Sequence, residues 1–414
     1  MRLFKNAKYD QLLLVAVLIL VLIGVVMITS IGVPKSIRIS APDLSYGDCG
    51  DAAVDCYLIL KKHLVRAGIG LLAMLMAWKM PYKAWKALAP IFYLAGAGLL
   101  IYVLFAGDDN NTFAKSWINL PALPFVDSIQ PSEIAKLGLI FYLSYFLAER
   151  ISYEKLQTLN EGFLKFAVIA GFIIGLIILQ PDIGSAFVLS AIAGVIFFVG
   201  GANIKHILAV LGIGAIFAVG AVATQDHIRE RVFAFMNPVD ECTGESYCWQ
   251  TRQANIAIGS GGFWGKGLTQ GIQKSFWLPQ AVDDFIFAAS SEELGFVRMS
   301  FIVILYALIA YRGFQIASHA PNKFSMLLAT GISTWIAVQS FVNIMVNTAL
   351  FPITGVTLPF MSYGGSSMVM TLFAVGVLLN ISQNTTHYEY SPDRRRYGRA
   401  RDSQPRYSGR YTRL

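Results

Sequence analysis

Charged residues are scarce in this 414-residue chain, in which Asp, Glu, Lys and Arg make up only 14% while hydrophobic residues make up 55%. A soluble domain carries about a quarter charged residues, so this composition argues against a surface that faces water on all sides. The mean hydropathy of +0.56 indicates a largely lipid surrounding. Internal repeats of roughly 20–50 residues are also absent, which argues against a solenoid or a propeller.

Cysteine is scarce as well, with only four residues: Cys49, Cys56, Cys242 and Cys248. All four fall in hydrophilic loops that we assign below to the outer side, where an oxidising compartment favours disulfides. Several connectivities are open, and the sequence does not choose among them. We favour the two local pairs because each closes a short loop. Zinc knuckles use spacings of roughly two to four residues, so a zinc site is the weaker interpretation.

Apolar segments, in contrast, are long and numerous. A bilayer-spanning helix needs roughly 20 apolar residues, and such segments lie near 11–33, 63–79, 87–106, 132–148, 164–180, 183–201, 205–223, 285–311, 324–350 and 364–382. The first is too long for a signal peptide and lacks a small-residue cleavage site. We therefore expect an all-α integral membrane protein of about ten transmembrane helices, with a long extracytoplasmic loop at 224–284 between helices 7 and 8.

Lys and Arg are distributed unevenly between the loops. With the N-terminus inside, the inner segments hold 20 of the 33 basic residues and the outer loops hold 10. This bias predicts that both termini are cytoplasmic. Residues 1–388 then form one membrane domain, and residues 389–414 form a basic, disordered cytoplasmic tail. We expect that tail to meet anionic lipid headgroups rather than nucleic acid.

Two polar pieces interrupt the apolar pattern near the fourth and sixth segments. In "QPSEIAK", Glu133 and Lys136 stand three residues apart at a helix start, so they can pair with each other. An alternative that stays open is a charged floor in which Lys136 faces an anionic ligand. In "LQPDIGSAF", Asp182 follows the helix-breaking Pro181, and it either caps the next helix or shapes a site.

Two loop sequences on the expected outer side lack a regular pattern. "IGSGGFWGKGLTQGIQK" is not a Walker A loop, because the stretch from Gly259 to Gly265 is one residue too long and Gly267 stands where Ser or Thr binds magnesium. Its Lys266 and Lys274 still have the charge to serve a diphosphate. "FPITGVTLPFMSYGGSS" cannot form a plain helix, so we expect its backbone to line a cavity or the outer rim.

Four acids lie close together in "LPQAVDDFIFAASSEELGF", where carboxylates near a bilayer are costly and usually mark function. If the stretch is helical, Asp284 and Glu292 are about 12 Å apart along the axis. That exceeds the roughly 5–10 Å of a two-carboxylate glycosidase. We therefore interpret Glu292 and Glu293 as packing or ion-pair residues, with Arg298 as a candidate partner, and retain Asp283 and Asp284 as functional candidates.

Six motifs in order resemble the SEDS family (shape, elongation, division and sporulation proteins) over residues 10 to about 385: "QPSEIAK", "QPDIGSAF", "IAIGSGGFWGKG", "LPQAVDDFIF", "EELGF" and "TLPFMSYGGSS". The first segment, the "GIQK" run and "GVTLPFMSYGGSS" are more similar to the division-type members than to the elongation-type ones. The resemblance implies a glycosyltransferase that polymerises lipid II on the outer face of the plasma membrane, here for the division septum.

The family motif Leu-Pro-Glu-x-His-Thr-Asp-Phe-Ile-Phe carries an acid that is taken as catalytic, and it falls on Asp284. Gln280, Val282 and Asp283 replace the family's Glu, His and Thr. The like charge of Asp283 should raise the pKa of Asp284 and so tune it. As a general base, Asp284 would take the proton of a sugar hydroxyl.

The resemblance also implies residues that contact the substrate, a polyprenyl-diphosphate-linked glycan. Lys136 and Lys266 would stabilise the departing diphosphate. An arginine of the family's Arg-Trp-Ile motif is missing, because this chain has Ser116-Trp117-Ile118 with Lys115 one place earlier. The candidates for substrate binding are Arg66, Glu133, Lys136, Gln253, Lys266, Ser362, Tyr363 and Gly364.

No cofactor is required by the sequence, although a divalent cation at Asp284 is compatible with it. The resemblance implies a class B penicillin-binding protein, a transpeptidase, as a partner, together with other division proteins. Three alternatives stay open: a flippase that moves lipid II, an elongation-type polymerase, and a scaffold that only recruits a synthase.

Overall fold

The computed structural model describes residues 9–42, 49–51, 53–107, 116–119, 128–236 and 247–384. Each of the ten predicted segments coincides with a helix, which confirms the all-α membrane fold. These helices are α1 (Gln11–Ile31), α3 (Leu58–Lys79), α4 (Tyr82–Ala106), α5 (Pro131–Tyr145), α7 (Leu164–Ile178), α8 (Ile183–Val199), α9 (Ile204–Thr224), α12 (Ile286–Ser318), α13 (Lys323–Asn347) and α14 (Gly365–Gln383).

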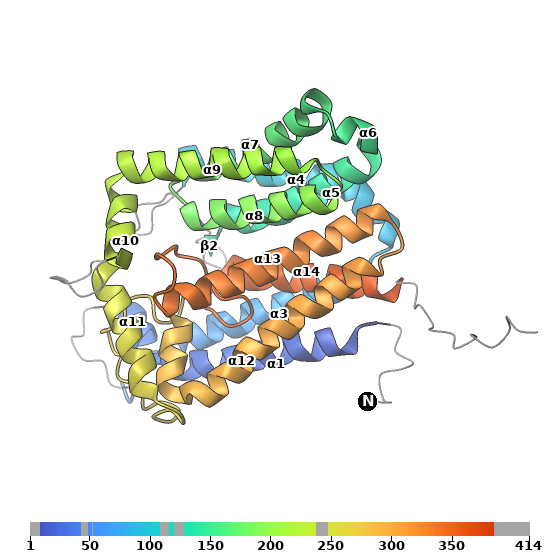
Figure 1. Ribbon diagram of the computed structural model, residues 1–414. Helices are drawn as coiled ribbons and strands as arrows, with labels where there is room; N and C mark the ends of the chain where they lie inside the picture. The colour runs from blue at the N-terminus through green and yellow to red at the C-terminus, as the bar shows by residue number, and fades with distance from the viewer. Residues whose placement is uncertain are drawn as a thin grey trace, which may run out of the picture.

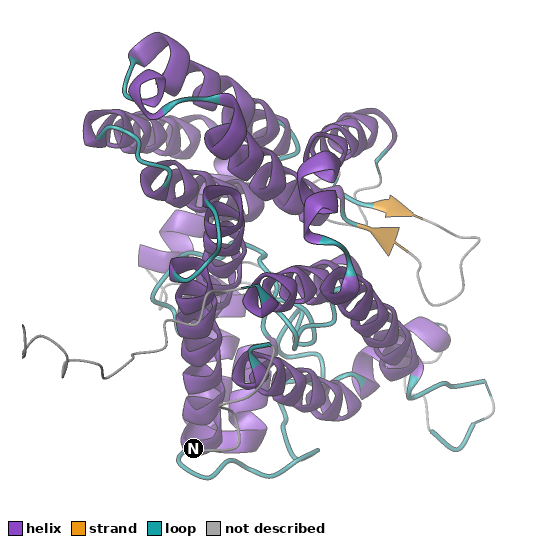
Figure 2. Ribbon diagram, turned by 90° about the vertical axis from the view of Figure 1, so that its right-hand side faces the viewer, coloured by secondary structure: helices purple, strands orange, loops and turns teal. Residues whose placement is uncertain are grey.

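The remaining elements are short. They are the helices α2 (Val33–Ser40), α6 (Tyr153–Leu156), α10 (Asp226–Met236) and α11 (Tyr247–Gly261), the π-helical turns η1 (Phe146–Arg150) and η2 (Leu159–Phe163), and the antiparallel strands β1 (Ile118–Asn119) and β2 (Ser128–Ile129). In Figure 1 the long helices run side by side, while α10 and α11 lie across one end of them. Figure 2 shows the two strands at the edge of the helical bundle.

Apolar and polar residues are arranged as a membrane protein requires. In the described part of the chain, six helices are apolar and long enough to cross a membrane. Large apolar side chains of α1 and α4, such as Leu22 and Leu94, are exposed on the outside. α13 instead buries polar residues, among them Gln339 and Asn343. The costly polar groups therefore face the protein interior, where they find partners.

Small residues allow the helices to approach closely, as is typical within bilayers. A Cβ added at Gly376 of α14 would lie 2.2 Å from the carbonyl oxygen of Met74 on α3. A Cβ at Gly138 of α5 would lie 2.5 Å from the carbonyl oxygen of Phe92 on α4. Any larger residue at either position would push the two helices apart.

Both described ends of the chain lie at one end of the bundle. Asp10 caps α1 by accepting from the Leu13 amide at 2.9 Å. Its own amide donates to the Ser382 hydroxyl at 3.1 Å, and its carboxylate pairs with Arg312 at 2.6 Å. The start of α1, the end of α14 and the C-terminal part of α12 therefore meet there.

The loop predictions can be compared with the structure where it describes them. Cys49 and Cys56 form a disulfide, with 5.8 Å between their Cα atoms, so this local pair is confirmed. Cys248 is also disulfide-bonded. Its predicted partner Cys242, like Lys115 and the tail at 389–414, lies outside the described residues.

Candidate functional site

Asp284 lies in the turn that leads into α12, at the end of the bundle opposite Asp10. Two amides of α13 fix its backbone: the side chains of Asn343 and Asn347 donate to the Asp284 carbonyl at 2.8 and 2.9 Å. Asn347 also accepts from the Ala288 amide at 2.9 Å, which holds the first turn of α12. The loop between α13 and α14 passes beside the carboxylate, since a Cβ at Gly355 would lie 3.7 Å from Asp284 Oδ2.

The Asp284 carboxylate has an unusual environment. In the part of the chain that the structure describes, it accepts no hydrogen bond and forms no ion pair. Burial, followed by the like charge of Asp283, raises the pKa of Asp284 to about 7. Lys35 and Arg231 oppose this increase, while Asp182 adds to it. Near neutral pH the carboxyl group therefore populates both protonation states, which suits a general base.

Asp283, in contrast, has partners for both its side chain and its backbone carbonyl. Its carboxylate forms an ion pair with Lys35 of α2. Its carbonyl accepts from the Ser362 hydroxyl at 2.6 Å, and the Tyr363 amide donates to the Val282 carbonyl at 2.9 Å. The structure thus brings two of the expected substrate-binding residues, Ser362 and Tyr363, against the backbone of Val282 and Asp283, next to Asp284.

Two cations surround the Tyr363 ring. The Arg66 guanidinium lies 4.6 Å from the ring centroid and the Lys35 ammonium 5.5 Å from it. Gly364 is the N-cap of α14, and a Cβ on Gly365 would meet the Arg66 guanidinium carbon at 3.1 Å. Positive charge from α2 and α3 and the start of α14 therefore gather beside the Asp283–Asp284 turn, an arrangement that attracts anions.

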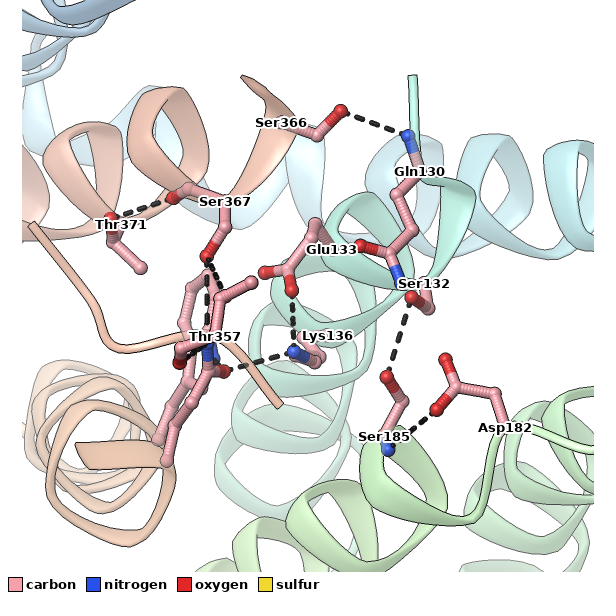
Figure 3. A network of polar contacts seen from close by, with 12 residues as sticks. Gln130, Ser132, Glu133, Lys136, Asp182, Ser185, Thr357, Ser366, Ser367 and Thr371 are labelled. Atoms are coloured by element: carbon pink, nitrogen blue, oxygen red, sulfur yellow. Dashed lines mark hydrogen bonds and ion pairs between the residues drawn. The ribbon is translucent and has the colours of Figure 1, made fainter. Parts of the chain in front are cut away.

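The predicted pair of Glu133 and Lys136 is present in the bundle interior (Figure 3). The two side chains are 2.7 Å apart and almost fully buried. Lys136 also donates to Gln339 at 2.9 Å, and the Gln339 amide reaches the Thr357 carbonyl at 3.2 Å. Glu133 Oε2 is buried without a hydrogen-bond partner among the described residues. The network links α5, α13 and the loop before α14.

Neighbouring contacts in Figure 3 extend this network to α8 and α14. Asp182 caps α8 by accepting from the Ser185 amide at 3.0 Å, as the cap interpretation predicts. The Ser185 hydroxyl lies 3.4 Å from that of Ser132 on α5. The Gln130 amide donates to Ser366 at 2.9 Å. The start of α5 is therefore fixed from two sides.

The glycine-rich loop at 262–275 forms backbone hydrogen bonds with α12 on both sides of a break in that helix. α12 is interrupted at Gly295, whose φ of 74° is not helical. Backbone groups of the loop replace the helical hydrogen bonds lost there, so the backbone groups of α12 keep partners at the break. The bonds are Lys266 N–H to Glu292 O (2.9 Å), Gly267 N–H to Glu293 O (3.1 Å), Phe296 N–H to Gly262 O (2.9 Å) and Val297 N–H to Phe263 O (3.2 Å).

Side-chain ion pairs also hold the 262–275 loop against α12. Glu292 pairs with Lys266 at 2.7 Å and Glu293 with Lys274 at 2.7 Å, and both carboxylates are buried. Ser30 of α1 donates to Glu293 at 2.7 Å. The ion-pair interpretation of the two glutamates is confirmed. Arg298, the partner suggested from the sequence, instead donates to the Trp264 carbonyl at 2.8 Å.

The expected site residue Gln253, and Ser116 at the position of the missing family arginine, take no part in these contacts. Gln253 is buried within α11, and Ser116 is buried beside β1. Within the described ranges, no group of three or more His, Cys, Asp or Glu side chains is arranged to hold a metal ion.

Sequence reasoning did not select Lys35, Asn343 or Asn347. Lys35 is one of the basic residues of the outer loops, and it follows Pro34 directly after the first apolar segment. Asn343 and Asn347 are spaced by one helical turn inside an otherwise apolar segment. Such a pair on one face of a membrane helix is a signal of internal hydrogen bonding that could have identified them.

Fold and site together define a multi-span membrane protein with a half-buried carboxylate and a group of cations at one end of its bundle. The FtsW/RodA/SpoVE family model, described as "cell cycle protein", matches residues 10–387. The chain belongs to this family, which is the SEDS family that its motifs resemble.

Similar proteins cover nearly the whole chain. The probable peptidoglycan glycosyltransferase FtsW of Trichlorobacter lovleyi is 35% identical over 92% of this chain and 94% of its own length. Stage V sporulation protein E of Bacillus subtilis is 36% identical over 92% and 98%. Among solved structures, a chain of a peptidoglycan synthase complex that coordinates polymerization and crosslinking has a TM-score of 0.71, 28% identity and coverage of 92% and 99%. RodA of Thermus thermophilus has a TM-score of 0.63, 26% identity and coverage of 91% and 97%.

Proposed function

We propose that this chain, a peptidoglycan glycosyltransferase of the SEDS family, polymerises lipid II into glycan strands with Asp284 as general base. The observation that carries the proposal is the position of the Asp284 carboxylate, which lies beside Gly355 of the loop before α14 and has no hydrogen-bond or ion-pair partner among the described residues. Burial and the like charge of Asp283 raise the pKa of Asp284, which suits the role of a base. The name of the Trichlorobacter lovleyi relative supports the reaction class. The position of Asp284 in the family motif supports its role.

In this reaction Asp284 takes the proton from the hydroxyl of the acceptor sugar. The hydroxyl oxygen then forms a bond to the anomeric carbon of the donor, and the bond from that carbon to the diphosphate breaks. The polyprenyl diphosphate leaves with the electron pair. A positioned general base typically contributes about 10²–10⁴-fold to such a step.

We assign the diphosphate to Lys35 and Arg66 in preference to Lys136 and Lys266. Lys136 is almost fully buried against Glu133, and Lys266 pairs with Glu292 at the break in α12. Lys35 is also paired, but with Asp283, so its ammonium lies next to Asp284. Lys35 and Arg66 face the same Tyr363 ring beside the aspartates. Ser362, Tyr363 and Gly364 shape the backbone of this part of the site. Four further residues stay predicted contributors to substrate binding that act through the surrounding structure: Glu133, Gln253, Lys136 and Lys266.

The proposal places the reaction on the outer face of the plasma membrane, with both termini in the cytoplasm. The distribution of Lys and Arg and the disulfide at Cys49–Cys56 support this orientation. A role in septal synthesis during division is supported by the division-type ending and by the FtsW relative. Similarity to the sporulation protein and to RodA makes those roles the alternatives.

A class B penicillin-binding protein is the proposed partner. The support is the similarity to a chain that was solved within a peptidoglycan synthase complex. Polymerising glycan and cross-linking it are consecutive steps on one product, so a transpeptidase next to this site would receive the new strand directly. Other division proteins are expected to recruit the pair to the septum.

An assay in detergent separates the polymerase from a flippase. Purified full-length protein, alone and with its transpeptidase partner, is incubated with labelled lipid II, and products are resolved by gel electrophoresis. Polymerisation needs no sealed membrane, so glycan chains are expected, whereas flipping cannot register in detergent. If lipid II stays monomeric in both samples, the proposed activity is wrong.

A further inference from the structure

Three aromatic side chains lie exposed where the 262–275 loop packs against α12. Phe263 and Trp264 are 70% and 71% exposed, and Phe296 on α12 is 65% exposed. The rings of Phe263 and Phe296 pack edge to face, with centroids 5.9 Å apart. Trp264 is the next residue along the same turn. An apolar group of this kind on a surface marks an interaction with another apolar phase or molecule.

This aromatic group continues the lipid-facing side of α12. Val297, Phe301 and Ile304 are exposed on the same helix, at spacings of four and three residues that keep them on one face. Phe296 precedes Val297 at the start of that row. Because α12 is one of the helices that can cross the membrane, the row identifies lipid as the phase that meets this surface.

Two arginines mark the membrane boundaries along α12. Arg298 and Arg312 flank the apolar run 299–311, and their Cα atoms are separated by about 21 Å along the helix axis. Arginines at such positions extend toward the headgroups. Arg312 lies with Asp10 at the end that holds both described termini. Arg298 marks the opposite boundary, and it donates directly to the Trp264 carbonyl.

We propose that Phe263, Trp264 and Phe296 insert into the layer between lipid headgroups and acyl chains and form an interfacial anchor. Trp favours that layer because its ring is apolar and also carries an N–H that can reach the headgroups. The two Phe rings add apolar area that inserts on the acyl side of the boundary. The anchor does not rest on the proposed function. It is joined to the protein interior through the ion pairs of Lys266 and Lys274 with the glutamates of α12. Lipid contact therefore fixes the depth of the helix start that follows Asp284.

Spin-label depth measurements test this anchor. The cysteines of the described part are disulfide-bonded, so a single added cysteine can be labelled in the full-length protein. Trp264→Cys and Phe296→Cys are the test positions. Arg229→Cys on exposed α10 is the aqueous control, and Ile304→Cys on α12 is the control inside the bilayer. The protein is reconstituted in vesicles of phosphatidylethanolamine and phosphatidylglycerol.

Collision of the label with oxygen and with a water-soluble nickel complex reports its depth. We expect labels at 264 and 296 to lose most of the nickel accessibility seen at 229 and to keep high oxygen accessibility, at a depth shallower than 304. Nickel accessibility equal to that at 229 would show a water-facing surface. Protection from both reagents would show a protein partner. Either result overturns the anchor, and the two test positions guard against local misfolding of one variant.

Discussion

At the scale of single residues, the two adjacent aspartates have opposite environments. Asp283 is neutralised by Lys35, and Asp284 has no such partner among the described residues. The family motif predicts Asp284 as the catalytic acid. The neighbouring Asp283 predicts that a like charge raises the pKa of Asp284. Lys35 could not be found from the sequence, because it lies 248 residues away from Asp283 and only the fold brings them together.

The pH dependence of polymerisation should report this charge arrangement. Asp284 must lose its proton to act as a base, so activity is expected to rise as pH increases through about 7. Asp283→Asn removes a like charge, which lowers the pKa of Asp284 and moves the rise to lower pH. Lys35→Met removes an opposite charge and moves it to higher pH. Initial rates from pH 5 to 9, taken at saturating lipid II, measure both shifts; shifts in the same direction would refute the arrangement.

Asn347 should matter for both stability and activity. Its side chain donates to the Asp284 carbonyl and accepts from the Ala288 amide. Asn347→Ala removes the side-chain acceptor of the buried Ala288 amide, at a cost of about 1–3 kcal/mol. It also leaves the Asp284 carbonyl with Asn343 as its remaining side-chain donor among the described residues. We expect a lower melting temperature and slower polymerisation. Thr348→Ala is the control, because among the described residues that hydroxyl bonds to carbonyls of its own helix. Equal behaviour of the two variants would contradict a positioning role for Asn347.

At the scale of elements, the ten long helices could be predicted because apolar length is a local property of the sequence. Features that depend on contacts between distant segments could not. α2, α10 and α11 are too short or too polar to give a hydropathy signal. α10 and α11 lie within the segment 224–284, which the sequence predicts as one long loop. The break in α12 at Gly295 is stable only because a loop some thirty residues earlier supplies its hydrogen bonds.

The buried pair of Glu133 and Lys136 on α5 has two interpretations, a structural ion pair and a direct contact of Lys136 with the substrate, and substitutions can separate them. Lys136→Met leaves Glu133 buried and unpaired, at a cost of about 3–5 kcal/mol. The double variant Glu133→Gln with Lys136→Met removes both charges and should recover most of that stability. If the pair is structural, the double variant also recovers lipid II polymerisation. Recovered stability without recovered activity would assign a role in the reaction to the charged pair of Glu133 and Lys136. Thermal unfolding in detergent and the polymerisation assay supply the two readouts.

At the scale of the whole molecule, the bundle separates its two ends by function. One end holds both described termini and the Asp10–Arg312 pair. The other holds the aspartates, the cations around Tyr363 and the loop that is built into α12. Site residues come from α2, α3, the turn before α12, α13 and the segment before α14, so the complete site forms only when these helices pack together.

The most direct measurement of the central claim is lipid II polymerisation by Asp284→Asn, with Asp283→Asn as the matched control and the transpeptidase partner present. Both substitutions keep the size of the side chain and remove one carboxylate from adjacent positions. We predict that Asp284→Asn loses at least about 10²-fold in rate, with a melting temperature close to that of the wild type, while Asp283→Asn stays active with a shifted pH profile. Equal activity of the two variants would contradict the assignment of Asp284 as the general base.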